Sequence, residues 1–161
     1  MPKKKSPQEN GAKGEEILRG ALRKKAGWSL LKTKEHFQGT PYKTAGTIRF
    51  ASPYDKGHFE SDGFIPEIEY ITEFKYGESH GSTEEKVMTD LEKIRDGVYG
   101  TQYRLVYIFW GSPEVSGTKT TGRCWAKVFR DKVQKENLPV EVVFATTDNG
   151  FDKWIEEVKN R

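Results

Sequence analysis

The sequence predicts an α/β (α+β) fold with the element order α-β-β-β-α-β-α-β-α. Segments in which apolar and polar residues alternate with a period of two indicate the strands. Segments with apolar residues three and four positions apart indicate the helices, and glycine, proline and capping signals separate the elements. A length of 161 residues suits one domain with a core of its own.

Composition excludes several classes of protein. Charged residues make up 32% of the chain and hydrophobic residues 34%, but 12% aromatic residues argue against disorder. The net charge of +3 permits a nucleic-acid partner without requiring one. Cys124 is the one cysteine, which excludes an internal disulfide and a multi-cysteine zinc site. With no long apolar run or secretory signal, we expect no membrane span and a cytoplasmic location, or the host cytoplasm for a phage or viral protein.

The first predicted element is a helix over residues 11–26, preceded by a flexible basic arm at residues 1–10. Glu15 lies at the border of the apolar face of this helix, whereas Glu16 points nearly opposite. Both glutamates suit the positive end of a helix, so a purely local role for them stays open. The apolar face itself is formed by Ile17, Leu18, Ala21 and Leu22.

A long basic segment at residues 28–46 follows this helix. Loops of this length tend to be functional or mobile. Interleaved aromatic and basic side chains are typical of contacts to a DNA groove or backbone. A solvated surface loop is the alternative interpretation. The candidate DNA-binding residues here are Lys32, Lys34, Lys43 and Tyr42.

Strands are predicted at residues 47–52, 58–65 and 68–76. In the third strand, Glu73 and Lys75 point to the same face because side chains two apart share a face.

The second and third strands are expected to form a hairpin with its turn at residues 66–67. That register pairs Asp62 with Ile71 and places Asp62 on the face of Glu73 and Lys75, diagonal to Glu73. A slip by one residue would turn Asp62 to the other face.

Two carboxylates beside a lysine suit a hard cation. Mg²⁺, for which Mn²⁺ may substitute, prefers oxygen ligands and needs only one or two protein carboxylates when a phosphate supplies more oxygens. Glu60 is a rival ligand, since the same register puts it opposite Glu73. Asp62 is favoured because Gly63 follows it and permits close approach of backbone or substrate. An exposed, salt-bridged sheet face is the alternative interpretation of the cluster.

The second half of the chain continues the alternation of elements. Ser82 and Glu85 form a capping box for a helix whose apolar stripe runs from Val87 to Val98, with Lys86 in its first turn. The next strand is predicted at residues 103–110 and is apolar on both faces. A Ser/Thr/Gly loop at residues 111–122 follows, with Lys119 as a further DNA-binding candidate. The last predicted elements are a helix at 123–137, a strand at 139–147 and a helix at 150–159.

Asp62, the Glu73-Phe74-Lys75 step and the helix after it resemble the PD-(D/E)xK nuclease superfamily. The stretch from Gly81 to Lys86 is also similar to the segment that follows this step in restriction-type members. Ser61 stands where the superfamily's proline is usually written. The resemblance covers residues 11–110 in the order of elements. It implies a restriction-endonuclease-like mixed sheet flanked by helices.

The resemblance also implies an activity, a Mg²⁺-dependent DNA endonuclease. Asp62, Glu73 and the carbonyl of Phe74 would hold the metal, and Lys75 would assist the attacking water. The first helix often carries a glutamate that faces the site, a role that Glu15 matches. The helix after the step often places a polar or basic residue near the scissile phosphate, a role that matches Lys86.

A restriction- or homing-type enzyme is the preferred member of this class, and a homodimer on duplex DNA suits its two antiparallel strands. A Holliday-junction resolvase or another structure-specific nuclease is the alternative within the class. A non-catalytic DNA-binding module of the same fold is the alternative outside it. A domain whose acidic face is merely solvated is the third possibility, and it would show no salt-dependent DNA affinity.

Overall fold

The structure is a computed structural model that describes residues 7–31, 49–51, 58–77, 83–115 and 124–161. Its elements, in chain order, are α1 (Pro7–Ala26), β1 (Arg49–Ala51), β2 (His58–Glu60), β3 (Gly63–Ile65), β4 (Tyr70–Gly77), α2 (Thr83–Arg95), β5 (Arg104–Gly111), the 3₁₀ turn η1 (Ser112–Glu114), α3 (Trp125–Glu136), β6 (Glu141–Phe144), the 3₁₀ turn η2 (Thr147–Asn149) and α4 (Gly150–Lys159).

The main sheet has four strands in the order β3-β4-β5-β6. The β3–β4 pair is antiparallel, whereas β4–β5 and β5–β6 are parallel, so the sheet is mixed as expected. The predicted α/β class is confirmed. The single strand predicted at residues 58–65 is divided, because β2 pairs with β1 in a separate two-stranded sheet and only β3 joins the main sheet.

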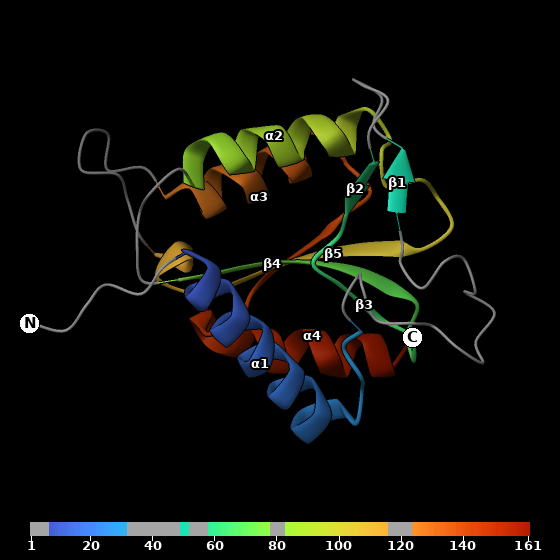
Figure 1. The fold of residues 1–161 in the computed structure, drawn as a ribbon, viewed down its shortest axis with the longest axis vertical. Coiled ribbons are helices and arrows are strands. Elements are labelled where there is room, and N and C mark those ends of the chain that lie inside the picture. The colour runs from blue at the N-terminus through green and yellow to red at the C-terminus, as the bar shows by residue number, and fades with distance from the viewer. Residues whose placement is uncertain (1–6, 32–48, 52–57, 78–82, 116–123) are drawn as a thin grey trace, which may run out of the picture.

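Helices cover both faces of the main sheet. Figure 1 shows α2 and α3 on one side and α1 and α4 on the other. The buried side chains accordingly form two clusters. Phe64, Ile71 and Tyr107 pack with α2 and α3, whereas Ile65 and Val106 pack with α1 and α4. Successive strand residues alternate between the two clusters, which explains the nearly continuous apolar sequence of β5.

The structure shows where the first two helices begin. The first helix begins at Pro7 rather than at residue 11, so part of the segment predicted as a flexible arm is helical. Proline suits the first turn of a helix because its missing N–H has no partner there. The second helix begins at Thr83, one residue after the predicted cap.

No helix in the described parts of the chain is long and apolar enough to cross a membrane.

The β3–β4 hairpin differs from its predicted register by two residues. Ile65 pairs with Tyr70 and Gly63 with Thr72, so the turn spans residues 66–69 instead of two central residues. Glu69 has a φ of 58° at the end of this turn, a left-handed conformation that the sequence does not signal. Because the shift is by an even number, each side chain keeps its predicted face.

Candidate active site

Asp62, Glu73 and Lys75 come from adjacent parts of the sheet and share one face of it. Extending the β3–β4 ladder by one residue places Asp62, and not Glu60, opposite Glu73. Glu60 pairs with Arg49 in the two-stranded sheet. The Asp62 carboxylate accepts a hydrogen bond from the Phe74 N–H at 2.9 Å, measured to Oδ2. The Asp62 side chain thus continues the ladder just before β3 begins.

Glu73 is buried beneath Asp62, with 6% of its surface exposed. Tyr99 Oη donates to Glu73 Oε1 at 3.2 Å and lies 2.9 Å from the hydroxyl of Tyr107. Burial and then the Asp62 charge raise the pKa of Glu73 well above its usual value, and a hydrogen bond between the two carboxyl groups adds to this, although Lys75 opposes it. Glu73 therefore holds its proton more tightly than an exposed glutamate does.

Lys75 forms an ion pair with Asp90 of α2, with 3.0 Å between Lys75 Nζ and Asp90 Oδ2. Burial alone would lower the pKa of this lysine. The charges of Asp90, Glu73 and Asp62 outweigh burial and raise the pKa above its usual value. Lys75 is therefore an ammonium group at neutral pH, as the neighbouring carboxylates lead one to expect, and it can donate hydrogen bonds but cannot serve as a base.

The other predicted site residues lie elsewhere or outside the described residues. A Cβ on Gly14 of α1 would meet the side chains of Phe74 and Tyr76, so α1 packs on the face of β4 opposite to Glu73. Glu15 follows Gly14 on that side of the sheet. Lys86 lies in the first turn of α2, where only the backbone is described. Lys32, Lys34, Tyr42, Lys43 and Lys119 lie outside the described residues.

Gly63 has a different role from the one expected of it. A Cβ at this position would come within 2.7 Å of Leu30 Cδ1 and 2.9 Å of Thr72 Oγ1. These atoms lie on the side of the sheet away from Glu73. The glycine therefore permits close packing against the chain's own side chains, and substrate access does not explain it.

Sequence reasoning missed Asp90, Tyr99 and Tyr107, all of which are buried. A signal for Asp90 was present, since it interrupts the apolar stripe formed by Val87, Leu91 and Ile94 on α2. An aspartate on such a stripe needs a buried partner. The tyrosines gave no comparable signal, because tyrosine is common in apolar strands and loops.

Within the described part of the chain, no group of three or more His, Cys, Asp or Glu side chains is disposed to hold a metal ion. The carboxylates of this site are thus a pair, Asp62 and Glu73, with Asp90 engaged by lysine. The lone thiol of Cys124 donates weak hydrogen bonds to the carbonyls of Pro113 and Glu114, at 3.4 and 3.3 Å from the sulfur.

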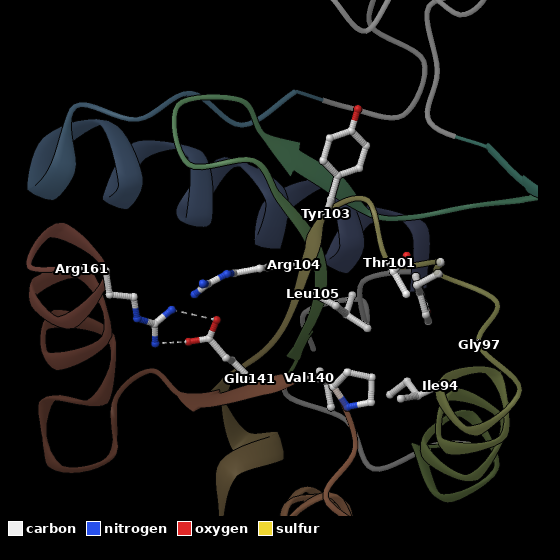
Figure 2. Close-up of a pocket in the computed structure, with 12 residues that line it drawn as sticks. Ile94, Gly97, Thr101, Tyr103, Arg104, Leu105, Val140, Glu141 and Arg161 are labelled. Atoms are coloured by element: carbon white, nitrogen blue, oxygen red, sulfur yellow. Dashed lines mark hydrogen bonds and ion pairs between the residues drawn. The ribbon is translucent and has the colours of Figure 1, made fainter.

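A cavity of about 480 Å³ lies beside this site, at the amino ends of β5 and β6. Figure 2 shows Arg161 turned towards Glu141 at one end, Arg104 pointing towards that pair, and Leu105 at the apolar end. Arg161 Nη2 lies 2.8 Å from Glu141 Oε1. Asp62, Glu73 and Lys75 do not line the cavity, but Tyr99 does, and its hydroxyl also donates to Glu73.

Comparison with known proteins identifies no family for this chain. The chain matches no protein-family model, no curated protein and no solved structure.

Proposed function

We propose that this protein is a Mg²⁺-dependent DNA endonuclease that hydrolyses phosphodiester bonds. One observation carries the proposal: the exposed carboxylate of Asp62, held by the Phe74 N–H at 2.9 Å, lies on the same face of the sheet as the buried carboxyl group of Glu73 and the ammonium of Lys75. The resemblance of the Asp62 and Glu73-Phe74-Lys75 pattern to the PD-(D/E)xK superfamily supports the same activity.

The donor set at this point fits a hard divalent cation. A cation between Asp62 and Glu73 would favour the carboxylate form of Glu73 and offset the repulsion between the two groups. The Phe74 N–H points to the side of β4 on which β3 pairs, at Asp62 just before β3 begins, and the carbonyl of a strand residue points to the same side as its N–H. Phe74 therefore offers a third oxygen. Mg²⁺ keeps several waters and takes further oxygens from phosphate, so this set suffices.

The residues around the pair have separable tasks in hydrolysis. Bound Mg²⁺ would supply a Lewis acid that polarises a phosphoryl oxygen and lowers the pKa of water. Lys75 supplies a fixed positive charge that stabilises the negative charge developing on the phosphate and donates a hydrogen bond to the attacking water. Tyr99 holds the Glu73 carboxylate in one orientation through its hydroxyl.

The preferred substrate is duplex DNA cut at a specific sequence by a homodimer. Two copies related by a two-fold axis match the two antiparallel strands of a duplex, so each copy would cut one strand. Specificity would reside in the basic segment at residues 28–46 and the loop at residues 111–122 with Lys119, which carry the candidate groove contacts.

The test is incubation of plasmid and phage DNA with the wild type and with Lys75→Met, in Mg²⁺ and in EDTA. The wild type is expected to cut in Mg²⁺ only, and Lys75→Met to lose at least a hundredfold in rate, the size of effect typical of a transition-state charge. Lys25→Met is the matched control. Lys25 pairs with Asp152 between α1 and α4, away from the site, so this variant should cut at the wild-type rate.

Substrate pattern separates the members of the class. Discrete bands from linear duplex support a sequence-specific enzyme. Cutting of a synthetic four-way junction regardless of sequence would instead support a junction resolvase. DNA binding that is equal in Mg²⁺ and EDTA, with no cutting on any substrate, would refute the proposed activity and favour a non-catalytic DNA-binding module.

A further inference from the structure

The residue that the proposed activity leaves unexplained is Asp90. This aspartate lies on the apolar face of α2, with 5% of its surface exposed. Its Oδ2 lies 3.0 Å from Lys75 Nζ, and its Oδ1 lies 3.9 Å from Lys93 Nζ. The Lys75 side chain is 20% exposed and that of Asp90 7%, so this ion pair is largely shielded from water. A buried carboxylate is costly unless it is paired, and Lys75 is the close partner of Asp90.

The charges around Asp90 suggest a purpose for this pairing. Lys75 and Glu73 lie two residues apart on the same face of β4, and Asp62 adjoins Glu73. Without Asp90, the nearest carboxylates for the Lys75 ammonium would be Glu73 and Asp62. A lysine that paired with either one would cancel part of the negative charge that attracts a divalent cation. The same lysine is nevertheless needed close by for the phosphate.

We infer that Asp90 is a positioning residue: it holds the Lys75 ammonium on the α2 side of the site and so leaves the Asp62–Glu73 pair free for a divalent cation. The inference rests on the metal site of the proposed function. It goes beyond that function because it assigns to α2 a control over metal affinity that acts through a single lysine.

The test is a double-mutant cycle read out as Mn²⁺ affinity by isothermal titration calorimetry at constant pH, without DNA. Asp90→Asn should weaken Mn²⁺ binding about tenfold, a typical coupling between neighbouring charged residues. Lys75→Met should bind Mn²⁺ at least as tightly as the wild type, because a positive charge beside the carboxylates has been removed. The double variant should bind like Lys75→Met, because Asp90 has nothing left to position.

The cycle distinguishes positioning from a simple loss of negative charge. If Asp90 only contributed to the local field, Asp90→Asn would weaken binding equally with and without Lys75, and that result overturns the inference. Unchanged affinity in Asp90→Asn overturns it as well. Asp152→Asn, which removes a surface carboxylate paired with Lys25, is the matched control and should leave the affinity unchanged.

A second variant keeps the test decisive where Asp90→Asn does not fold. Asp90→Ser retains a small hydrogen-bond acceptor without the charge and should show the same loss, again absent in the Lys75→Met background.

Failure of the proposed function is separable from failure of this inference. A wild type that binds Mn²⁺ with the predicted cycle yet cuts no DNA refutes the nuclease alone. A wild type that cuts DNA while Asp90→Asn binds Mn²⁺ normally refutes the inference alone, and a wild type that binds no Mn²⁺ refutes both.

Discussion

Glu73 and Glu114 are both buried, with 6% and 0% of their surfaces exposed, yet their surroundings differ in kind. The Glu114 carboxylate accepts hydrogen bonds from the N–H groups of Gly111, Thr146 and Thr147 at 2.7, 2.9 and 3.0 Å, and from the Thr146 hydroxyl. These donors come from the ends of β5 and β6, which the glutamate ties together.

Glu73 has a poorer set of partners. One tyrosine hydroxyl donates to it, and the charged groups that act on it include the carboxyl group of Asp62 and the ammonium of Lys75. The comparison teaches that burial of a carboxylate does not by itself indicate function. In this protein the buried carboxylate with several donors links the ends of two strands, whereas the one placed against a second carboxyl group has a single donor among the described residues, which makes it the better candidate for a binding site.

The largest effect is expected when the satisfied carboxylate is altered. Glu114→Gln replaces one accepting oxygen with an NH₂ group that faces N–H donors, and it should cost about 3 kcal/mol of the free energy of unfolding. Urea denaturation followed by tryptophan fluorescence measures this. Glu136→Gln, at a surface pair with Arg95, is the control and should change little. A Glu114→Gln protein as stable as the wild type would show that the hydrogen bonds of Glu114 do not stabilise the fold.

The next effect is stabilisation by metal. A ligand that binds only the folded state at one hundred times its dissociation constant stabilises by about 2.7 kcal/mol. Mn²⁺ should therefore raise the melting temperature of the wild type and of Glu114→Gln, relative to EDTA. Glu73→Gln and Asp62→Asn should lose the shift, because each removes one of the two carboxylates. An equal shift in Glu73→Gln would show that the cation binds elsewhere.

Without metal, Glu73→Gln should stabilise the protein at alkaline pH. The pKa of Glu73 in the folded protein is raised, so the folded state binds this proton more tightly than the unfolded state does. The corresponding stability is fully present below the ordinary pKa of 4.5 and is lost as pH rises through the raised value. The variant carries no such loss, so its advantage over the wild type should be larger at pH 8 than at pH 4.

Unfolding free energies measured in EDTA across the pH range test this prediction. The difference between Glu73→Gln and the wild type should grow with pH from about 4.5, the ordinary glutamate pKa. A difference that is independent of pH, or a wild type that is the more stable protein at pH 8, would mean that Glu73 is as well satisfied as Glu114.

The smallest effect is expected for the tyrosine that donates to Glu73. Tyr99→Phe removes that donor and one partner of the Tyr107 hydroxyl, which should cost about 1 kcal/mol of stability. Tyr103→Phe, whose hydroxyl accepts from Gln102 at the surface, is the matched control. A loss in Tyr99→Phe no larger than in the control would show that the tyrosine pair does not support the glutamate.

The sequence predicted those parts of the site that local periodicity determines. Alternation along β4 put Glu73 and Lys75 on one face, and the hairpin brought Asp62 to the same face although its register was wrong by two residues. The error was harmless because the pleat repeats every two residues. The longer turn makes a tertiary contact, in which Glu67 accepts a hydrogen bond from the Ser29 N–H, and a local pattern does not reveal such a contact.

What the sequence did not predict depends on packing between distant elements. Asp90 and Tyr99 reach the site because α2 and the segment after it fold over β4, and Glu114 acquires its donors only where the ends of β5 and β6 meet. The division of residues 58–65 into β2 and β3 has the same origin, since β2 found its partner in β1. Helix periodicity indicated which face of α1 is buried but not which side of the sheet it covers.

Crystals soaked in Mn²⁺ and measured for anomalous scattering would test the central claim most directly. We expect one strong peak for a Mn²⁺ ion that is coordinated by the Asp62 and Glu73 carboxylates and the Phe74 carbonyl, with Lys75 still paired to Asp90. An empty position between these two carboxylates, with density for the ion elsewhere on the protein or nowhere, would contradict it.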